Sequence, residues 1–150
     1  MAETRHTTSY YAASANPAPE RPALQGSHET DVCIVGAGFT GISAALHLAE
    51  QGFKVTVLEA VKVGFGASGR NGGQIVNSYS RDIDVIERTL GAQQARLLGD
   101  MAFEGGRIIR ERVAQYNIQC DLKDGGVFAA FNSKHMKHLE AQKQLWERYG

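Results

Sequence analysis

One stretch of the chain, residues 31–59 (DVCIVGAGFTGISAALHLAEQGFKVTVLE), constrains the fold more than any other. It begins with an unbroken apolar run at residues 32–35, which is typical of a strand buried on both faces of a parallel sheet. Three glycines with the spacing G-x-G-x-x-G follow, and apolar residues then recur at helical intervals through residues 42–49. A second apolar run at residues 55–58 ends in Glu59. This order predicts an α/β fold that opens with a βαβ unit.

The glycines and the acid have separate physical tasks in such a unit. Gly36 allows a sharp turn, Gly38 allows a backbone to approach a pyrophosphate, and Gly41 allows the helix to pack closely on the strands. The helix N-terminus favours phosphate charge, and Glu59 can accept hydrogen bonds from the hydroxyls of an adenosine ribose. We therefore predict dinucleotide binding, and a carboxylate at this place argues against NADP. The alternative is a glycine-rich turn that binds no ligand.

A second glycine-rich loop, GFGASGRNGGQ at residues 64–74, follows directly after the acidic strand end. Its backbone donors, hydroxyl and amide groups favour contact with a ligand, and Arg70 can neutralise pyrophosphate charge. A nicotinamide dehydrogenase has no general need of such a loop, whereas a longer and permanently held cofactor such as FAD gains from it. The alternative is a mobile surface loop.

Composition narrows the functional classes. The chain has 150 residues, about one domain, and its 16 basic and 16 acidic residues provide no net field to attract nucleic acid or an anionic membrane. We expect neither partner. With no apolar run long enough for a membrane span and no signal core at the start, we expect a cytoplasmic protein. The two cysteines have no metal or redox spacing, and Cys33 is predicted to be a small buried hydrophobe.

The rest of the chain is predicted to be mostly helical. Residues 1–29 hold all three prolines and are interpreted as a partly ordered arm, so that the oxidoreductase domain begins at residue 30. Residues 81–118 have a helical pattern that Gly91 interrupts, and Asp84 with Glu87 resembles a capping box. The charged residues near 107–112 are expected to form local ion pairs on a solvated helix face.

The C-terminal third contains a predicted strand and a predicted helix. Val127 to Phe131 is an apolar run that we expect to start a second sheet. Asn132 or Ser133 is expected to cap a helix over residues 134–149. His135 and His138 lie three residues apart, but without a visible third ligand we interpret them as part of an exposed polar face and predict no metal site.

The glycine fingerprint, Glu59 and the second loop together resemble the D-amino-acid-oxidase-like superfamily of FAD-dependent amine oxidoreductases, which includes glycine and sarcosine oxidases. A narrower likeness is to the branch that oxidises gamma-glutamylputrescine. It rests on SYYAASAN near the start, GFGASGRNGGQIVNSYSRDIDVIER, FEGGRIIRERV and the final WERYG. The resemblance implies a Rossmann-like FAD-binding βαβ unit, followed by helices and the start of a substrate-domain sheet.

The resemblance also implies the cofactor-binding residues. The fingerprint would hold the FAD pyrophosphate, Glu59 the adenosine ribose, and the second loop the ribityl and pyrophosphate side. The expected set is Gly36, Ala37, Gly38, Phe39, Thr40, Gly41, Glu59, Ala67, Ser68, Gly69, Arg70, Asn71, Gly72, Gly73 and Gln74. Because the loop contains neither histidine nor cysteine, we expect non-covalent FAD.

The implied activity is oxidation of gamma-glutamylputrescine, or of a related polyamine or amino acid, with dioxygen as the oxidant and hydrogen peroxide as a product. Members of this superfamily are much longer, so the sequence is expected to be an N-terminal portion that is inactive alone and holds no assignable catalytic residue. Two alternatives stay open: an NAD-dependent dehydrogenase domain, and a non-catalytic nucleotide-binding fragment. The sequence leaves the oligomeric state undetermined.

Overall fold

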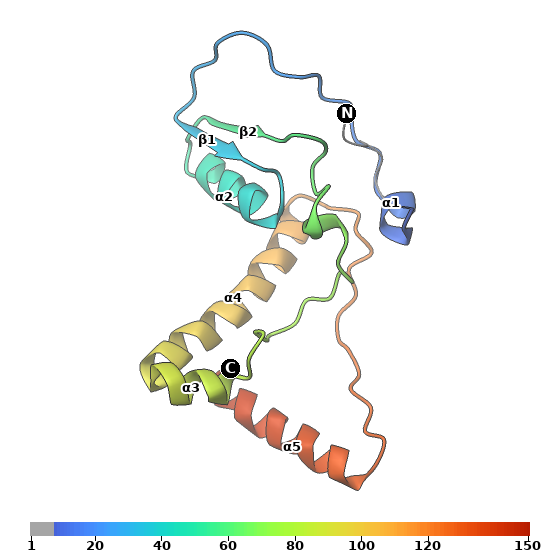
Figure 1. The fold of residues 1–150 in the computed structure, drawn as a ribbon, viewed down its shortest axis with the longest axis vertical. Helices are drawn as coiled ribbons and strands as arrows, with labels where there is room; N and C mark the ends of the chain where they lie inside the picture. Colours follow the sequence, from blue (N-terminus) through green and yellow to red (C-terminus); the bar gives the residue numbers. More distant parts are fainter. Residues whose placement is uncertain (1–7) are drawn as a thin grey trace. The chain divides into compact units, whose positions relative to one another are not determined.

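The computed structural model describes residues 8–150, which divide into two compact units, a first that ends at Gln74 and a second over residues 75–150 (Figure 1). The first unit contains an α/β arrangement, and the second contains helices. The elements of the first unit are α1 (Tyr10–Ser14), β1 (Val32–Val35), α2 (Phe39–Glu50), β2 (Val55–Leu58) and the short 3-10 helix η1 (Ala67–Gly69). Those of the second unit are α3 (Ile83–Leu90), α4 (Ala92–Gln115) and α5 (Ser133–Glu147).

The predicted βαβ unit is present, with the expected boundaries. Strands β1 and β2 pair in parallel, with Val32 opposite Val55 and Val35 opposite Leu58. Helix α2 connects the two strands and packs against both of them (Figure 1). It ends just before Gly52, whose φ of +88° is the left-handed conformation that glycine adopts readily after a helix. Local sequence signals were sufficient to define this unit.

The predicted burial of the first strand on both faces is wrong for this chain. Cys33 is exposed rather than buried, and 86% of the Val35 surface is exposed. Helix α2 packs on the two-stranded sheet, and the alternating residues Val32 and Ile34 are half-buried, whereas Cys33 and Val35 point to the opposite face, where no described helix forms a covering layer. The apolar pattern of residues 32–35 is that of a sheet covered on both faces.

In the second unit, a sharp break separates α3 from α4, as predicted. Gly91 has a φ of +89° and is both the C-cap of α3 and the N-cap of α4. The predicted capping box is wrong, because Asp82 rather than Asp84 occupies the N-cap position of α3. Asp84 lies inside the first turn of the helix, where its carboxylate pairs with Arg88 at 3.0 Å.

The core of the second unit lies where α3, α4 and the end of the chain meet. Ile83, Ala95 and Tyr149 are buried, and Phe103 and Trp146 pack against them. The ring of Tyr149 lies against Gly99 of α4, where a Cβ would come within 2.6 Å of the ring. The Tyr149 hydroxyl donates a hydrogen bond to Glu87 of α3 at 2.8 Å. A glycine on α4 therefore makes room for the aromatic ring that closes this core.

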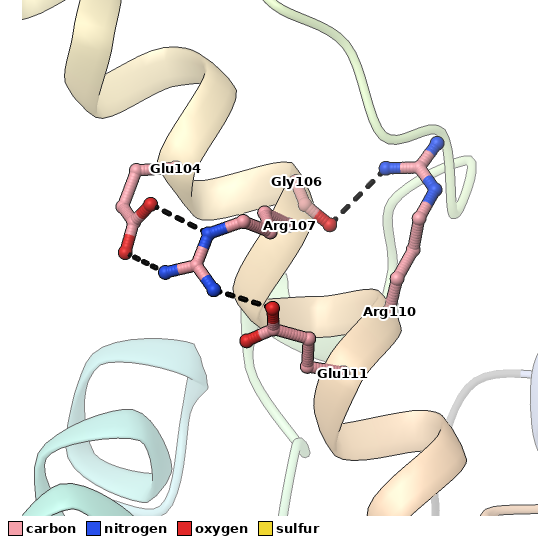
Figure 2. A network of polar contacts seen from close by, with 5 residues as sticks. All are labelled: Glu104, Gly106, Arg107, Arg110 and Glu111. Carbon is pink, nitrogen blue, oxygen red and sulfur yellow. Dashed lines mark hydrogen bonds and ion pairs between the residues drawn. The ribbon is translucent and has the colours of Figure 1, made fainter.

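The middle of α4 carries the predicted ion pairs on an exposed face. Figure 2 shows the guanidinium of Arg107 between the carboxylates of Glu104 and Glu111. Its Nε donates to Glu104 Oε2 at 2.8 Å, and the two carboxylates raise the pKa of Arg107. Arg110 donates to the carbonyl oxygen of Gly106, one turn earlier, at 3.1 Å. All these groups are half exposed, so the network belongs to the solvated surface.

The predicted strand at Val127–Phe131 is absent. Residues 119–132 contain no helix or strand, and Val127 and Phe131 are more than nine-tenths exposed. A strand requires a partner for its backbone groups, and none of the other described segments pairs with this one. The predicted final helix is confirmed as α5, with Asn132 as its N-cap; its side-chain oxygen accepts from the amide of His135 at 2.9 Å.

No helix among residues 8–150 has the length and apolar character needed to cross a membrane. The same residues contain no group of three or more His, Cys, Asp or Glu side chains placed to hold a metal ion. His135 lies on α5 with its ring stacked between those of Phe131 and His138.

Candidate functional site

The turn between β1 and α2 has the geometry that its glycines predict. Gly36 leaves the strand with a φ of +100°, and its amide donates to the carbonyl oxygen of Leu58 at 2.7 Å. Helix α2 then passes so close to this turn that a Cβ at Gly41 would lie 2.0 Å from the carbonyl oxygen of Gly36. No side chain fits in that space. The third glycine is therefore required for close packing of helix and strand, as predicted.

Glu59 at the end of β2 is tied to this turn. Its Oε2 accepts a hydrogen bond from the Ala37 amide at 2.8 Å, and its Oε1 accepts one from the Val61 amide at 3.1 Å. These bonds lower the pKa of the Glu59 carboxyl below its ordinary value of 4.5, and the bond from Ala37 has the largest effect. The group is therefore ionised at neutral pH. Since a carboxylate offers about four acceptor positions, acceptor capacity remains for a hydroxyl donor of a ligand.

The N-terminus of α2 presents unpaired backbone donors beside Glu59. Within residues 8–150, no protein group accepts a hydrogen bond from the amides of Thr40 and Gly41. The first turn of α2, which the structure describes completely, contains no acidic residue that would compete with a bound anion. The N-cap is Gly38, which has no side chain to shield these donors. The helix dipole and the free amides together favour a phosphate group here.

The second glycine-rich loop is attached to the same turn. The Gly64 amide donates to the carbonyl oxygen of Ala37 at 2.9 Å, and the Phe39 amide donates to Ser68 Oγ at 2.9 Å. Inside the loop, Asn71 Nδ2 donates to the Ser68 carbonyl oxygen at 2.7 Å. The loop is therefore held in place by specific hydrogen bonds on both sides of η1.

Arg70, predicted to neutralise pyrophosphate charge, makes its contacts with Phe65. Its Nε donates to the carbonyl oxygen of Phe65 at 3.1 Å, and its guanidinium carbon lies 5.2 Å from the centre of the Phe65 ring. Both of these contacts lie within its own loop. The side chain is exposed, so its other guanidinium nitrogens remain accessible to an anion from outside.

The structure brings part of the predicted set together. The fingerprint residues, Glu59 and Ser68 form one hydrogen-bonded cluster, in which Ala37 and Phe39 are the bonded partners from the turn. The remaining predicted residues follow or surround η1 in the second loop: Ala67, Gly69, Arg70, Asn71, Gly72, Gly73 and Gln74. Two residues that bear on the site were not predicted, Val61 and Phe65. Their roles depend on a backbone amide and a ring contact, for which the sequence has no signal.

The residues present fit the adenosine and pyrophosphate part of a dinucleotide. The cluster combines free amides at a helix N-terminus, a glycine N-cap and an ionised carboxylate with acceptor capacity to spare. Free amides and a helix dipole bind phosphate, and a carboxylate at the end of the second strand binds ribose hydroxyls. This is the chemistry of a dinucleotide site rather than of a metal or nucleophile site.

Comparison with known proteins agrees with this geometry. The family described as DAO, FAD dependent oxidoreductase, matches residues 31–150. The chain is 63% identical over 147 residues to the gamma-glutamylputrescine oxidoreductase of Escherichia coli (strain K12), covering 98% of this chain and 34% of that protein. It is 45% identical to the probable oxidoreductase OrdL of Haemophilus influenzae, covering 100% of this chain and 35% of that one. The OrdL protein of Rhizobium meliloti is 36% identical, with 95% and 33% covered.

The matches extend over nearly the whole of this chain but over only part of each relative. The chain spans about a third of the length of these curated relatives. The search of solved structures found no significant match to the chain. The family match includes the turn, Glu59 and the second loop, so the predicted resemblance is confirmed at the level of the family. The chain belongs to the DAO family of FAD-dependent oxidoreductases.

Proposed function

We propose that this chain supplies the adenosine- and pyrophosphate-binding part of an enzyme that holds FAD non-covalently and oxidises an amine. The observation that carries the proposal is the cluster in which Glu59 accepts from Ala37 beside the free amides of Thr40 and Gly41. The cluster supports binding of both ends of an adenosine diphosphate group. Membership of an FAD-dependent family supports FAD as the dinucleotide.

The residues of this chain would bind and orient the cofactor. Glu59 would accept the ribose hydroxyls, the α2 N-terminus would receive the pyrophosphate, and the second loop would cover it. When bound, FAD would supply the redox chemistry, as acceptor of the hydride on the carbon that carries the amine nitrogen and as donor of two electrons, with two protons, to dioxygen to give hydrogen peroxide. The absence of histidine and cysteine from residues 64–74 supports non-covalent attachment.

For the substrate, we propose gamma-glutamylputrescine or a related polyamine or amino acid. The support is the 63% identity to a protein named gamma-glutamylputrescine oxidoreductase. Residues that orient the amine are proposed to lie outside the 150 residues, because this chain spans about a third of the length of these relatives. We also propose that Val127–Phe131 becomes a strand of the substrate-domain sheet when the remainder of such an enzyme is present.

The test is to purify the full-length gene product that carries this chain and to examine it for bound flavin. We expect a yellow protein whose flavin is released by denaturation, and peroxide formation with gamma-glutamylputrescine. In Glu59→Ala, the proposal predicts weaker flavin binding, whereas Glu20→Ala, which removes an exposed carboxylate of the same unit, serves as the matched control. A colourless protein that binds NAD instead would contradict the proposal.

A further inference from the structure

The hydroxyl of Ser68 occupies the space that Gly38 leaves open. Ser68 lies in η1, and its Oγ would be 2.9 Å from a Cβ added to Gly38. The same oxygen accepts a hydrogen bond from the Phe39 amide at 2.9 Å, the first amide of α2. Gly38 itself makes no side-chain cap, so the cap of this helix comes from a residue 29 positions away from Phe39.

Three further hydrogen bonds show that this contact helps to fix the whole second loop. At its start, the Gly64 amide donates to the Ala37 carbonyl oxygen at 2.9 Å. After η1, Asn71 donates to the carbonyl oxygen of Ser68, and the Asn71 side-chain oxygen accepts from the Gly73 amide, both at 2.7 Å. Ser68 is therefore the point at which the internally bonded half of the loop is attached to α2.

We propose that Ser68 is a positioning residue that assembles the two glycine-rich loops into one phosphate-binding surface before the cofactor arrives. The proposal rests on the proposed function, because it concerns the binding of a dinucleotide at this turn. A loop that is already ordered has less entropy to lose when a ligand binds, so the cofactor binds more tightly. In this arrangement Gly38 is needed as much for the approach of Ser68 as for the approach of a phosphate.

The chemistry of a hydroxyl suits this role. A serine hydroxyl has one donor and two acceptor positions, so Ser68 Oγ can accept from Phe39 while its own proton remains available to a phosphate oxygen. The competing interpretation is that Ser68 merely fills the anion position and must leave when a phosphate binds. The two interpretations predict opposite effects of removing the hydroxyl on cofactor affinity.

The first experiment measures coupling in the apoprotein of the full-length gene product. A Cβ at Gly38 would force the Ser68 hydroxyl away from Phe39, so Gly38→Ala and Ser68→Ala remove the same hydrogen bond. We expect the melting temperature of the double variant to match that of the more destabilised single variant. Additive decreases would overturn the proposal, because they would mean that the two sites act independently.

The second experiment titrates the same apoprotein with FAD and follows flavin fluorescence. We expect Ser68→Ala to raise the dissociation constant roughly fivefold, the equivalent of one ordinary hydrogen bond, and Ser68→Thr to restore it. Ser80→Ala, at an exposed serine of the other unit, is the matched control and should leave it unchanged. An unchanged or lower dissociation constant in Ser68→Ala refutes the role of Ser68. A wild-type protein that binds no FAD refutes the proposed function instead.

Discussion

The amide of Ala37 donates a hydrogen bond of 2.8 Å to the carboxylate of Glu59, joining the glycine-rich turn to the end of the second strand across 22 positions of sequence. Glu59 thus has a structural contact in addition to its proposed contact with a ribose. The bond orients the carboxylate towards the N-terminal end of α2, where the unpaired amides lie. The Glu59 side chain therefore both holds the glycine-rich turn and is a candidate ligand-binding group of the site.

This bond gives the first unit a predictable pH dependence. Because hydrogen bonds to the ionised form lower the folded-state pKa of Glu59, the carboxylate stabilises the fold at pH values above its ordinary pKa of 4.5. That stabilisation is lost as the pH falls through the lower, folded-state pKa. We expect Glu59→Gln to be less stable than the wild type at neutral pH, and the difference to shrink in acid. Urea denaturation at a series of pH values measures it, and a difference that stays constant with pH would contradict the assignment.

The second prediction concerns the close approach of α2 to the turn. Gly41→Ala would place a Cβ 2.0 Å from a backbone oxygen that cannot rotate away, so we expect a loss of about 3 kcal/mol or more in stability, together with loss of dinucleotide binding. Gly66→Ala is the matched control, because a Cβ there meets no atom within 4 Å. Thermal denaturation of the two variants compares them directly. Equal stability of both would show that the helix is free to move away from the strand.

The third prediction concerns two glycines of α4, at which substitution by alanine should change stability in opposite directions. Gly105 is in a helix interior with open space around its Cβ position, so Gly105→Ala should raise stability by roughly 0.5–1 kcal/mol. A Cβ added at Gly99 would lie 2.6 Å from the Tyr149 ring, so Gly99→Ala should lower stability by about 1–3 kcal/mol. Chemical denaturation of the two variants should move the midpoint in opposite directions. Stabilisation by both would mean that Tyr149 does not pack on α4.

A fourth prediction concerns the charged network on α4 (Figure 2). Arg107 pairs with Glu104 and Glu111, but all three side chains are about half exposed. Exposed pairs of this kind contribute little, so Arg107→Gln should lower the melting temperature only slightly, and high salt should make that decrease smaller still. Melting temperatures at low and high salt measure it. A large loss that salt does not change would point to a buried role for Arg107.

The features that could be predicted from the sequence are those that depend on residues close together along the chain. The strand, glycine turn, helix and second strand of residues 32–58 formed as expected, since each has its own local signal. The break at Gly91 and the cap at Asn132 also follow from local backbone requirements. The prediction of a capping box was wrong because Asp82 and Asp84 are both suitable N-cap residues. The backbone conformation decides between them, and Asp82 is the residue with an extended backbone.

Features that depend on distant partners were not predictable. The burial of Cys33 requires a second layer over its face of the sheet, and the strand at Val127–Phe131 requires a neighbouring strand; the apolar patterns imply both, but the described residues include neither. In the site, the pairing of Ser68 with Phe39 joins two loops that the sequence marks separately as glycine-rich. Nothing in either loop alone indicates which hydroxyl meets which amide.

The burial of Tyr149 has a consequence for the order of events during synthesis. The contacts of the dinucleotide site all lie within residues 36–73, so they can form soon after that part of the chain has left the ribosome. The core of the second unit is completed later, because Tyr149, which is buried together with Ile83 and Ala95, is made last of the three. The nascent protein can therefore acquire its nucleotide-binding turn while the helices that follow it are still unpacked.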